Sequence, residues 1–290
     1  MRPTILVTGA KGQIGFELVR LLAPHGEVIA ADRASLDLAD PDAIVAAVRG
    51  AKPELIVNAG AYTAVDRAES EPALAGAVNG RAPGILAEEA KRCGALLIHY
   101  STDYVFDGAA ATPYREEAPT APLNVYGATK LEGERAIAEV GGHALVFRTS
   151  WVYGLRGKNF LLTVQRLAAE RDELRIVADQ IGVPNWSRAL AEATVRVVSA
   201  GLSAATERAG LYHLSATGRA SWCEFAQAIV GDAPSPRVVP IGSAEYPTPA
   251  RRPAYGVLAT RRFEAAFGFA LAEWRETLAR CMASTKERAG

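Results

Sequence analysis

The sequence predicts an α/β fold in which helices cover both faces of a parallel sheet. Short apolar runs alternate with segments of helical periodicity along residues 1–150, and this alternation is typical of a parallel sheet with crossover helices. Hydrophobic residues make up 49% of the 290-residue chain, which is enough to fill a large core and excludes a disordered chain. The length allows one large domain or two domains.

The predicted elements of the first half alternate between strand and helix. Strands are expected at residues 4–7, 28–31, 55–58, 96–100 and 144–148. Helices are expected after the turn that follows the first strand, and at residues 41–48, 82–92 and 123–139. The last helix should end near the glycine pair at 141–142, because glycine favours helix C-termini.

The second half is less regular, since seven prolines interrupt it between residues 184 and 253. Helices are expected at residues 160–170 and 189–200, and a strand at residues 211–214 is expected to rejoin the first sheet. We therefore predict one domain from residues 1–150, with residues 185–214 returning to it. Residues 151–184 and 215–290 are predicted to form a smaller, partly interleaved C-terminal domain.

Charge and cysteine content narrow the class of protein. The 32 Lys and Arg residues balance 32 Asp and Glu residues, so no overall positive field exists for nucleic acid or anionic lipid. Three widely spaced cysteines predict free thiols. The sequence shows neither a signal peptide pattern nor the roughly eighteen apolar residues of a membrane helix. We expect a cytoplasmic protein that binds neither nucleic acid nor membrane.

A glycine-rich turn between the first strand and the first helix indicates a phosphate site. Gly9, Gly12 and Gly15 form Thr-Gly-x-x-Gly-x-x-Gly, and a pyrophosphate needs close backbone approach and a helix N-terminus directed at it. This context predicts a Rossmann-type, doubly wound sheet that binds a dinucleotide. Asp32 ends the second strand, where an acidic residue binds the adenosine ribose. Arg33 can pair with a 2′-phosphate, so NADH and NADPH both stay open.

Tyr126 and Lys130 are four residues apart in a predicted helix, which puts both side chains on one face. A neighbouring ammonium favours the phenolate and should lower the pKa of Tyr126 toward the working range of a general acid. Ser101 and Thr102 stand at the carboxyl end of a predicted strand, where open α/β sheets bind ligands. We expect Thr102 to hydrogen-bond a substrate carbonyl that Tyr126 protonates, with Ser101 as a structural neighbour.

Four motifs together resemble the extended short-chain dehydrogenase/reductase family: TGAKGQIG at residues 8–15, NAGA at 58–61, STDYVF at 101–106 and YGATK at 126–130. Four more are similar to the branch that reduces 4-keto dTDP-sugars: AVDRAE at 64–69, PLNVYG at 122–127, FRTSWVY at 147–153 and YPTPARRP at 246–253. The resemblance spans the whole chain. It implies NAD(P)H-dependent reduction of the C4 ketone of dTDP-4-dehydro-L-rhamnose to dTDP-L-rhamnose, a precursor of cell-envelope polysaccharides.

The resemblance also implies a role for individual residues. Thr102, Tyr126 and Lys130 would be the catalytic triad, with Lys130 also holding the nicotinamide ribose. The cofactor would lie along the positions that match the family pattern, which are Gly12, Gln13, Ile14, Asp32, Asp37, Leu38, Ala61, Tyr62 and Thr63. The implied NAD(P)-binding Rossmann domain is the first predicted domain, and the second would bind the nucleotide sugar.

Three residues match substrate positions of the family. Trp151 would pack against the thymine base, Arg252 would neutralise the diphosphate, and Asp103 would lie on the substrate side. The residues by themselves also allow core packing for Trp151, a surface ion pair for Arg252 and a turn cap for Asp103.

The sequence departs from the family pattern at one place, and the resemblance also raises the possibility of a bound metal. DQIGVP at residues 179–184 fits the family, but Asn185-Trp186 follows where Thr is usual after the proline, which puts local nucleotide contacts in doubt. Some relatives bind magnesium at a dimer interface through acidic residues, and the sequence allows a homodimer. It shows no compact carboxylate cluster, so we predict no metal. The histidines are expected to be packed or exposed rather than ligands, and they are His25, His99, His143 and His213.

Two further functions stay open on the sequence. A nucleotide-sugar dehydratase or epimerase of this fold uses the same tyrosine and lysine, but the dehydratases carry Asp-Glu beside the threonine, whereas this chain has Asp103-Tyr104. A non-catalytic NADP-binding regulatory subunit, such as the β subunit of methionine adenosyltransferase, also resembles the family, and fold similarity does not exclude it. The intact set of Thr102, Tyr126 and Lys130 favours an enzyme.

Overall fold

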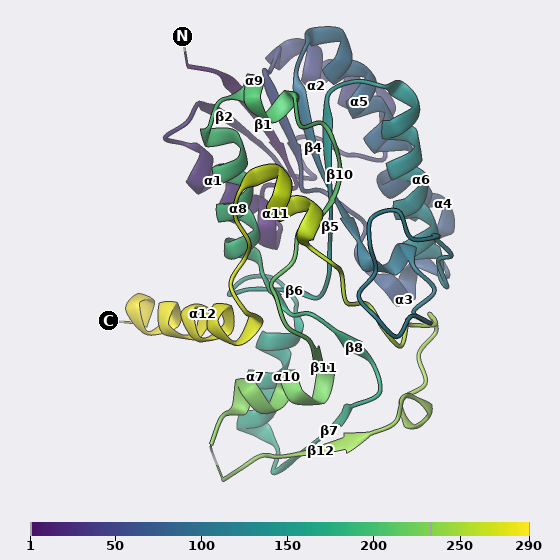
Figure 1. The fold of residues 1–290 in the computed structure, drawn as a ribbon, viewed down its shortest axis with the longest axis vertical. Helices are drawn as coiled ribbons and strands as arrows, with labels where there is room; N and C mark the ends of the chain where they lie inside the picture. The colour runs from purple at the N-terminus through teal and green to yellow at the C-terminus, as the bar shows by residue number, and fades with distance from the viewer. Residues whose placement is uncertain (1, 233, 290) are drawn as a thin grey trace.

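The computed structural model describes residues 2–232 and 234–289, with the backbone alone over residues 285–289. Its centre is a six-stranded parallel sheet (Figure 1). The strands are β1 (Thr4–Thr8), β2 (Glu27–Ala31), β3 (Leu55–Asn58), β4 (Leu96–Thr102), β5 (Ala144–Thr149) and β10 (Gly210–His213). They lie in the order β10-β5-β4-β3-β1-β2, and every neighbouring pair is parallel. The predicted Rossmann-type doubly wound sheet is confirmed.

Helices cover both faces of this sheet (Figure 1). One face carries α1 (Gln13–Leu22), α8 (Ser187–Ser199), α9 (Leu202–Thr206) and α11 (Arg261–Phe267). The other carries α2 (Pro41–Ala51), α5 (Ala82–Cys93) and α6 (Val125–Val140). Because side chains alternate along a strand, Val7 packs into the first core and Leu6 into the second.

The ends of the helices follow from their sequence. Asp40 accepts hydrogen bonds from the first turn of α2, and Asn124 caps α6 by accepting from the Gly127 N–H. The α6 helix therefore begins at Val125, two residues later than predicted. Gly141, at φ 63°, ends it in the left-handed conformation that glycine adopts easily.

A broken helical segment precedes α5. It consists of α3 (Val65–Ala68), α4 (Pro72–Ala75) and the π-helical stretch η1 (Gly76–Arg81). The π-helical stretch directs Asn79 inward, where its amide contacts Tyr62 and Thr129. A π-helical turn often accompanies a functional site, and this one lies against the helix that carries Tyr126 and Lys130.

The rest of the chain forms a less regular part with a core of its own (Figure 1). Three two-stranded pairs build it: β6 (Val152–Tyr153) with β9 (Asn185–Trp186), β7 (Glu173–Val177) with β12 (Arg237–Ile241), and β8 (Ile181–Gly182) with β11 (Ala220–Ser221). Its helices are α7 (Phe160–Glu170), α10 (Trp222–Val230) and α12 (Trp274–Ala289). Phe225 and Trp274 are fully buried in this core.

The chain returns to the first sheet twice. The predicted strand at residues 211–214 is confirmed as β10, which pairs with β5. The α8 helix also packs on the first core through Leu190. A second return, through Phe263 of α11, falls within the segment 215–290 that the predicted division gave to the other domain. No helix of the described residues combines the length and hydropathy needed to cross a bilayer.

Candidate active site

A cavity of about 750 Å³ lies along the carboxyl edge of β1, β3 and β4. This is the edge of the sheet, next to the switch in strand order between β1 and β3, where open α/β folds bind ligands. Most of the predicted site residues form its wall, namely Gly9, Gly12, Gln13, Ile14, Asp32, Arg33, Asp37, Leu38, Ala61, Tyr62, Thr63, Thr102, Asp103, Tyr126, Lys130 and Trp151. Gly15 and Arg252 do not line it.

The glycine turn has the geometry of a phosphate cradle. Gly9 has φ +64°, and a Cβ there would lie 2.6 Å from the backbone nitrogen of Gly60. A Cβ on Gly15 would lie 2.2 Å from the carbonyl oxygen of Gly9, so Gly15 serves helix packing rather than the cavity wall. Gly12 begins α1 without a side-chain cap, which leaves the N–H groups of the first turn to bind an anion. These residues fit a dinucleotide pyrophosphate.

The end of the cavity near β2 is rich in exposed charge. The Asp32 carboxylate forms an ion pair with Lys11 and accepts hydrogen bonds from the backbone of Ala34 and Ser35. The Lys11 hydrogen bond, followed by that of Ser35, lowers the pKa of Asp32 to about 2. Arg33 lines the same end. Two cations beside one carboxylate can balance the charge of a 2′-phosphate, so the structure accommodates NADPH as well as NADH.

Thr102, Tyr126 and Lys130 meet at the other end of the cavity. Thr102 ends β4, and its hydroxyl donates to Asp103 Oδ1 (3.1 Å) and accepts from the Tyr104 N–H (3.2 Å). Lys130 is only 2% exposed, and its Nζ donates to the Tyr100 carbonyl oxygen at 2.6 Å. The structure therefore brings the three predicted catalytic side chains together.

The electrostatics of this end differ from the expectation. The spacing predicts that Lys130 lowers the pKa of Tyr126, but loss of solvation raises that pKa to about 12, while the contact with the Thr102 hydroxyl lowers it more weakly. Burial of the phenol is the larger effect, and the Lys130 ammonium is directed toward β4, where it contacts Tyr100 and His99. Burial also lowers the pKa of Lys130 itself to about 8.

Asp103 is an unusual carboxyl group. It is 2% exposed, and burial raises its pKa to about 7 against weaker hydrogen bonds from Thr102 and the backbone. Its Oδ2 has no hydrogen-bond partner among the described residues. This oxygen faces Gly256, where a Cβ would lie 2.4 Å from it. A buried carboxylate oxygen without a partner disfavours the charged form, in agreement with the raised pKa.

Trp151 lines the cavity and has φ 42°, a conformation that few residues other than glycine adopt. Its indole stacks on that of Trp222, with ring centroids 3.6 Å apart and an interplanar angle of 8°. Gly182 packs so closely that a Cβ would lie 2.5 Å from the Trp151 ring. Both indoles line the cavity, so they form an aromatic site for a flat heterocycle.

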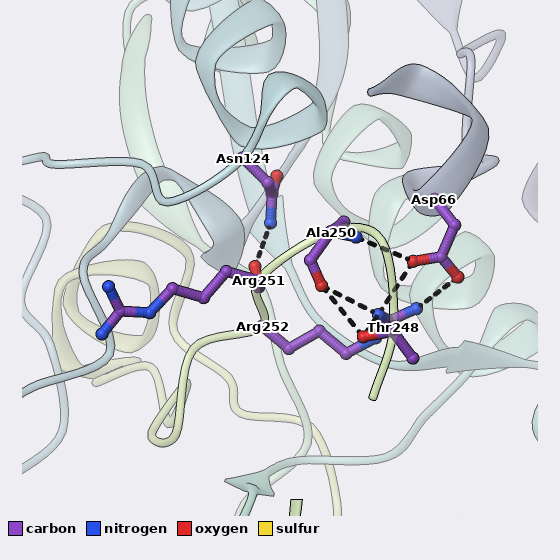
Figure 2. A network of polar contacts seen from close by, with 6 residues as sticks. All are labelled: Asp66, Asn124, Thr248, Ala250, Arg251 and Arg252. Carbon is purple, nitrogen blue, oxygen red and sulfur yellow. Dashed lines mark hydrogen bonds and ion pairs between the residues drawn. The ribbon is translucent and has the colours of Figure 1, made fainter. Parts of the chain in front are cut away.

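Arg252 is engaged by a network that Figure 2 shows. Its guanidinium forms two hydrogen bonds with the Asp66 carboxylate, at 3.0 and 2.9 Å, and also donates to Thr248 and the Ala250 carbonyl. Asn124 donates to the Arg251 carbonyl, while the Arg251 side chain points away from the network (Figure 2). The loop at residues 246–253 is thus fixed to α3 and to the cap of α6.

The sequence did not single out three side chains that the structure places at the site. Trp222 faces Trp151, Lys11 pairs with Asp32, and His99 contacts Lys130. Lys11 lies within the glycine motif, which could have drawn attention to it. No sequence signal joins Trp222 or His99 to the site, because their partners are distant in the chain.

Ser101 and Asn185 have structural contacts and do not belong to the catalytic set. Ser101 donates to Glu134, a structural contact. Asn185 is buried, and its amide hydrogen-bonds Ser150, Val183 and Ala216, so it supports the backbone and does not line the cavity. Among the side chains that the structure describes, within residues 2–232 and 234–284, no group of three or more His, Cys, Asp or Glu residues is placed to hold a metal.

The fold and the site together define a nicotinamide-dependent oxidoreductase of the extended short-chain dehydrogenase/reductase type. The family model of the RmlD substrate binding domain matches residues 1–287. A dTDP-4-dehydrorhamnose reductase from Burkholderia thailandensis is 49% identical over 96% of this chain and 97% of its own length. One from Escherichia coli K12 is 43% identical over 93% of this chain and 94% of its own.

The solved structures agree with this assignment. The crystal structure of a dTDP-4-dehydrorhamnose reductase from Bacillus anthracis, in complex with NADP, has a TM-score of 0.92 to this chain at 34% identity. The match covers 98% of this chain and 100% of the Bacillus anthracis chain. The chain therefore belongs to the dTDP-4-dehydrorhamnose reductase family.

Proposed function

We propose that the chain transfers a hydride from NADPH or NADH to the C4 ketone of dTDP-4-dehydro-L-rhamnose, giving dTDP-L-rhamnose. The observation that carries the proposal is the meeting of Thr102, Tyr126 and Lys130 in one cavity whose other end is the glycine turn. A threonine hydroxyl, a phenol and an ammonium can together stabilise and protonate an oxygen that gains negative charge.

Each catalytic side chain has a distinct task. The Thr102 hydroxyl, which now donates to Asp103, can turn its proton to the ketone oxygen and hold the carbonyl in place. The Tyr126 hydroxyl gives its proton to that oxygen as charge develops there. Lys130 has a donor left after its contact with Tyr100, and this donor can hold the nicotinamide ribose. The bound cofactor supplies the hydride.

The remaining residues would bind the two ends of the ligands. The uncapped start of α1 would hold the cofactor pyrophosphate, with Asp32 at the adenosine ribose. On the substrate side, the aromatic pair of Trp151 and Trp222 would receive the thymine base. Arg252 lies outside the cavity wall, so we propose that it reaches the diphosphate by exchanging part of its contact with Asp66.

The direct test is an absorbance assay at the wavelength of the reduced nicotinamide. Purified protein is mixed with the 4-keto dTDP sugar and either NADPH or NADH, and Tyr126→Phe serves as the control. We expect cofactor consumption that matches formation of dTDP-L-rhamnose, and loss of most of it in the variant. A folded protein that consumes neither cofactor would refute the proposal, and tight binding to another protein would then favour the regulatory alternative.

The same assay distinguishes reduction from dehydration. A dehydratase takes a hydride from C4 of a 4-hydroxy sugar and returns it to the sugar after water is lost, so with the 4-keto sugar it would consume no added NADPH or NADH. The structure gives little support for dehydration, because the residue after Asp103 is Tyr104 rather than a second carboxylate. None of the cysteines Cys93, Cys223 and Cys281 forms a disulfide, which suits the reducing cytoplasm that we propose as the location of the protein. A homodimer stays a prediction.

A further inference from the structure

Three polar side chains form a row across the sheet beneath α6, the helix that carries Tyr126 and Lys130. Thr8, Asn58 and His99 occupy matching register positions on β1, β3 and β4. Strand alternation puts His99 on the same face as Leu97, which α6 covers. The exposed fractions of the three side chains are 1%, 1% and 0%. Polar groups buried this completely need a continuous set of hydrogen bonds.

The row forms a chain of contacts that ends at Lys130. The Gly60 N–H donates to Thr8 Oγ1 at 3.3 Å, and the Thr8 hydroxyl donates to Asn58 Oδ1 at 2.7 Å. Asn58 Nδ2 lies 3.0 Å from His99 Nδ1, and His99 Nε2 lies 3.1 Å from Lys130 Nζ. A hydrogen-bonded path therefore joins the backbone beside the phosphate cradle to the catalytic lysine.

The direction of the hydrogen bonds ties the charge of Lys130 to the tautomer of His99. When the Asn58 amide donates to Nδ1, a neutral imidazole carries its proton on Nε2, and Lys130 must then accept as an amine. Rotating the Asn58 amide by half a turn exchanges its oxygen and nitrogen, so that Thr8 Oγ1 accepts from the Asn58 amide instead of donating to it. Nδ1–H then donates to Asn58, and Nε2 accepts from the ammonium. Each charge state of Lys130 thus has one matching tautomer.

Of the two side chains in contact, His99 and Lys130, the lysine is the one that titrates near neutral pH. Burial and the nearby Lys130 hold the pKa of His99 well below its usual value, so the ring stays neutral. Glu134, on the same helix, raises the pKa of Lys130 against burial, and Arg148 of β5 pairs with Glu134. On the cavity side, Tyr126 and Asp103 have pKa values of about 12 and about 7, and the pKa of Lys130, about 8, lies between them.

We propose that His99 is a positioning residue for Lys130, accepting a hydrogen bond from its ammonium form, donating one to its amine form and changing tautomer when the lysine loses its proton. The inference rests on the proposed function only for the catalytic task of Lys130. The hydrogen bond from the ammonium is charge-assisted and is the stronger of the two. His99 therefore favours the charged lysine that a reductase needs beside Tyr126 and the nicotinamide ribose.

The first test needs no substrate. The full chain, labelled with 15N at histidine and free of cofactor, is titrated by NMR from about pH 6 to about pH 10, a range that brackets the lysine pKa. His99→Phe assigns the signal. We expect the Nδ1–H tautomer below a midpoint near pH 8 and the Nε2–H tautomer above it. A single tautomer throughout, or an imidazolium, would overturn the proposal.

The second test compares pH profiles of kcat. The variant His99→Phe removes the acceptor and should lower the pKa of Lys130. The loss of kcat on the alkaline side should therefore occur about one pH unit lower, while the KM for the sugar stays the same. His99→Gln keeps an acceptor and should shift this basic limb of the kcat profile by less. His213→Phe is the matched control, because His213 is also 0% exposed but lies on β10 against Phe106, and it should keep the wild-type profile.

The outcomes separate this inference from the proposed function. An inactive wild-type protein would refute the reductase, yet the NMR titration would still test the link between His99 and Lys130. An active wild type whose basic limb does not move in folded His99→Phe, or moves equally in His213→Phe, would refute the positioning role alone.

Discussion

The two ends of the cavity treat their charged groups in opposite ways. Lys130 is 2% exposed and lies at the end that we propose is catalytic, called here the catalytic end. The Lys11 side chain is 80% exposed and lies at the end near β2 where we propose that the adenosine binds, called here the adenosine end. Burial shifts pKa values and makes each hydrogen bond matter. Exposed charges interact weakly, because water screens them. The catalytic end should therefore control the rate, and the adenosine end should control the choice of cofactor.

The largest effect should come from Lys130→Met, which removes a buried charge and a ribose contact together. We expect kcat/KM to fall by about 10³-fold, with weaker binding of cofactor as part of the loss. Steady-state kinetics and cofactor titration by fluorescence measure the two parts. A defect confined to sugar affinity would contradict the role assigned to Lys130.

Tyr126→Phe should have the next largest effect and should be more selective. It removes the proton donor but leaves the ring that packs against Tyr104. We expect kcat to fall by about 10²-fold or more with nearly unchanged cofactor affinity. The same two measurements apply, and normal turnover in this variant would show that another group donates the proton.

Asp103→Asn tests whether the catalytic end is as poorly solvated as the structure indicates. Burial raises the Asp103 pKa from 3.8 to about 7, so between these values the folded protein holds a proton that the unfolded chain has released. The free energy of unfolding should therefore fall as pH rises through this interval. The variant should show a flatter dependence in urea unfolding at several pH values, and equal slopes would argue that Asp103 is solvated.

Arg33→Ala should give the smallest effect, because its side chain is exposed. We expect NADPH affinity to fall by about three- to tenfold relative to NADH affinity, since only NADPH carries the 2′-phosphate. Lys11→Met should act in the same direction by leaving Asp32 uncompensated. Titrations with both cofactors at two salt concentrations would measure this. Equal losses for NADPH and NADH would place Arg33 outside the phosphate site.

The first half of the fold could be predicted because its signals are local. Apolar runs, the glycine turn and the four-residue spacing of Tyr126 and Lys130 all lie within single elements. The elements at residues 55–58 and 160–170 have the predicted limits. The return of Phe263 to the first core could not be read locally, since its partners, such as Phe147, come from distant strands.

The sequence predicts which residues form the site, but not the contacts between them or their solvation. Spacing puts Tyr126 and Lys130 on one face, but it does not say where the ammonium points or how well it is solvated. Those facts depend on β4, which supplies Tyr100 and His99. The expected drop in the pKa of Tyr126 was wrong for the same reason, because burial is a property of the assembled fold.

The stacked pair of Trp151 and Trp222 gives the protein a built-in optical signal. Two nearly parallel indoles with centroids 3.6 Å apart couple their electronic transitions, and that coupling changes when a nucleobase parts the rings or covers one of them. If the nucleotide binds there as we propose, near-ultraviolet circular dichroism will follow its binding without any chemical label. The aromatic pair that would hold the base would thus also give the spectroscopic signal of its binding.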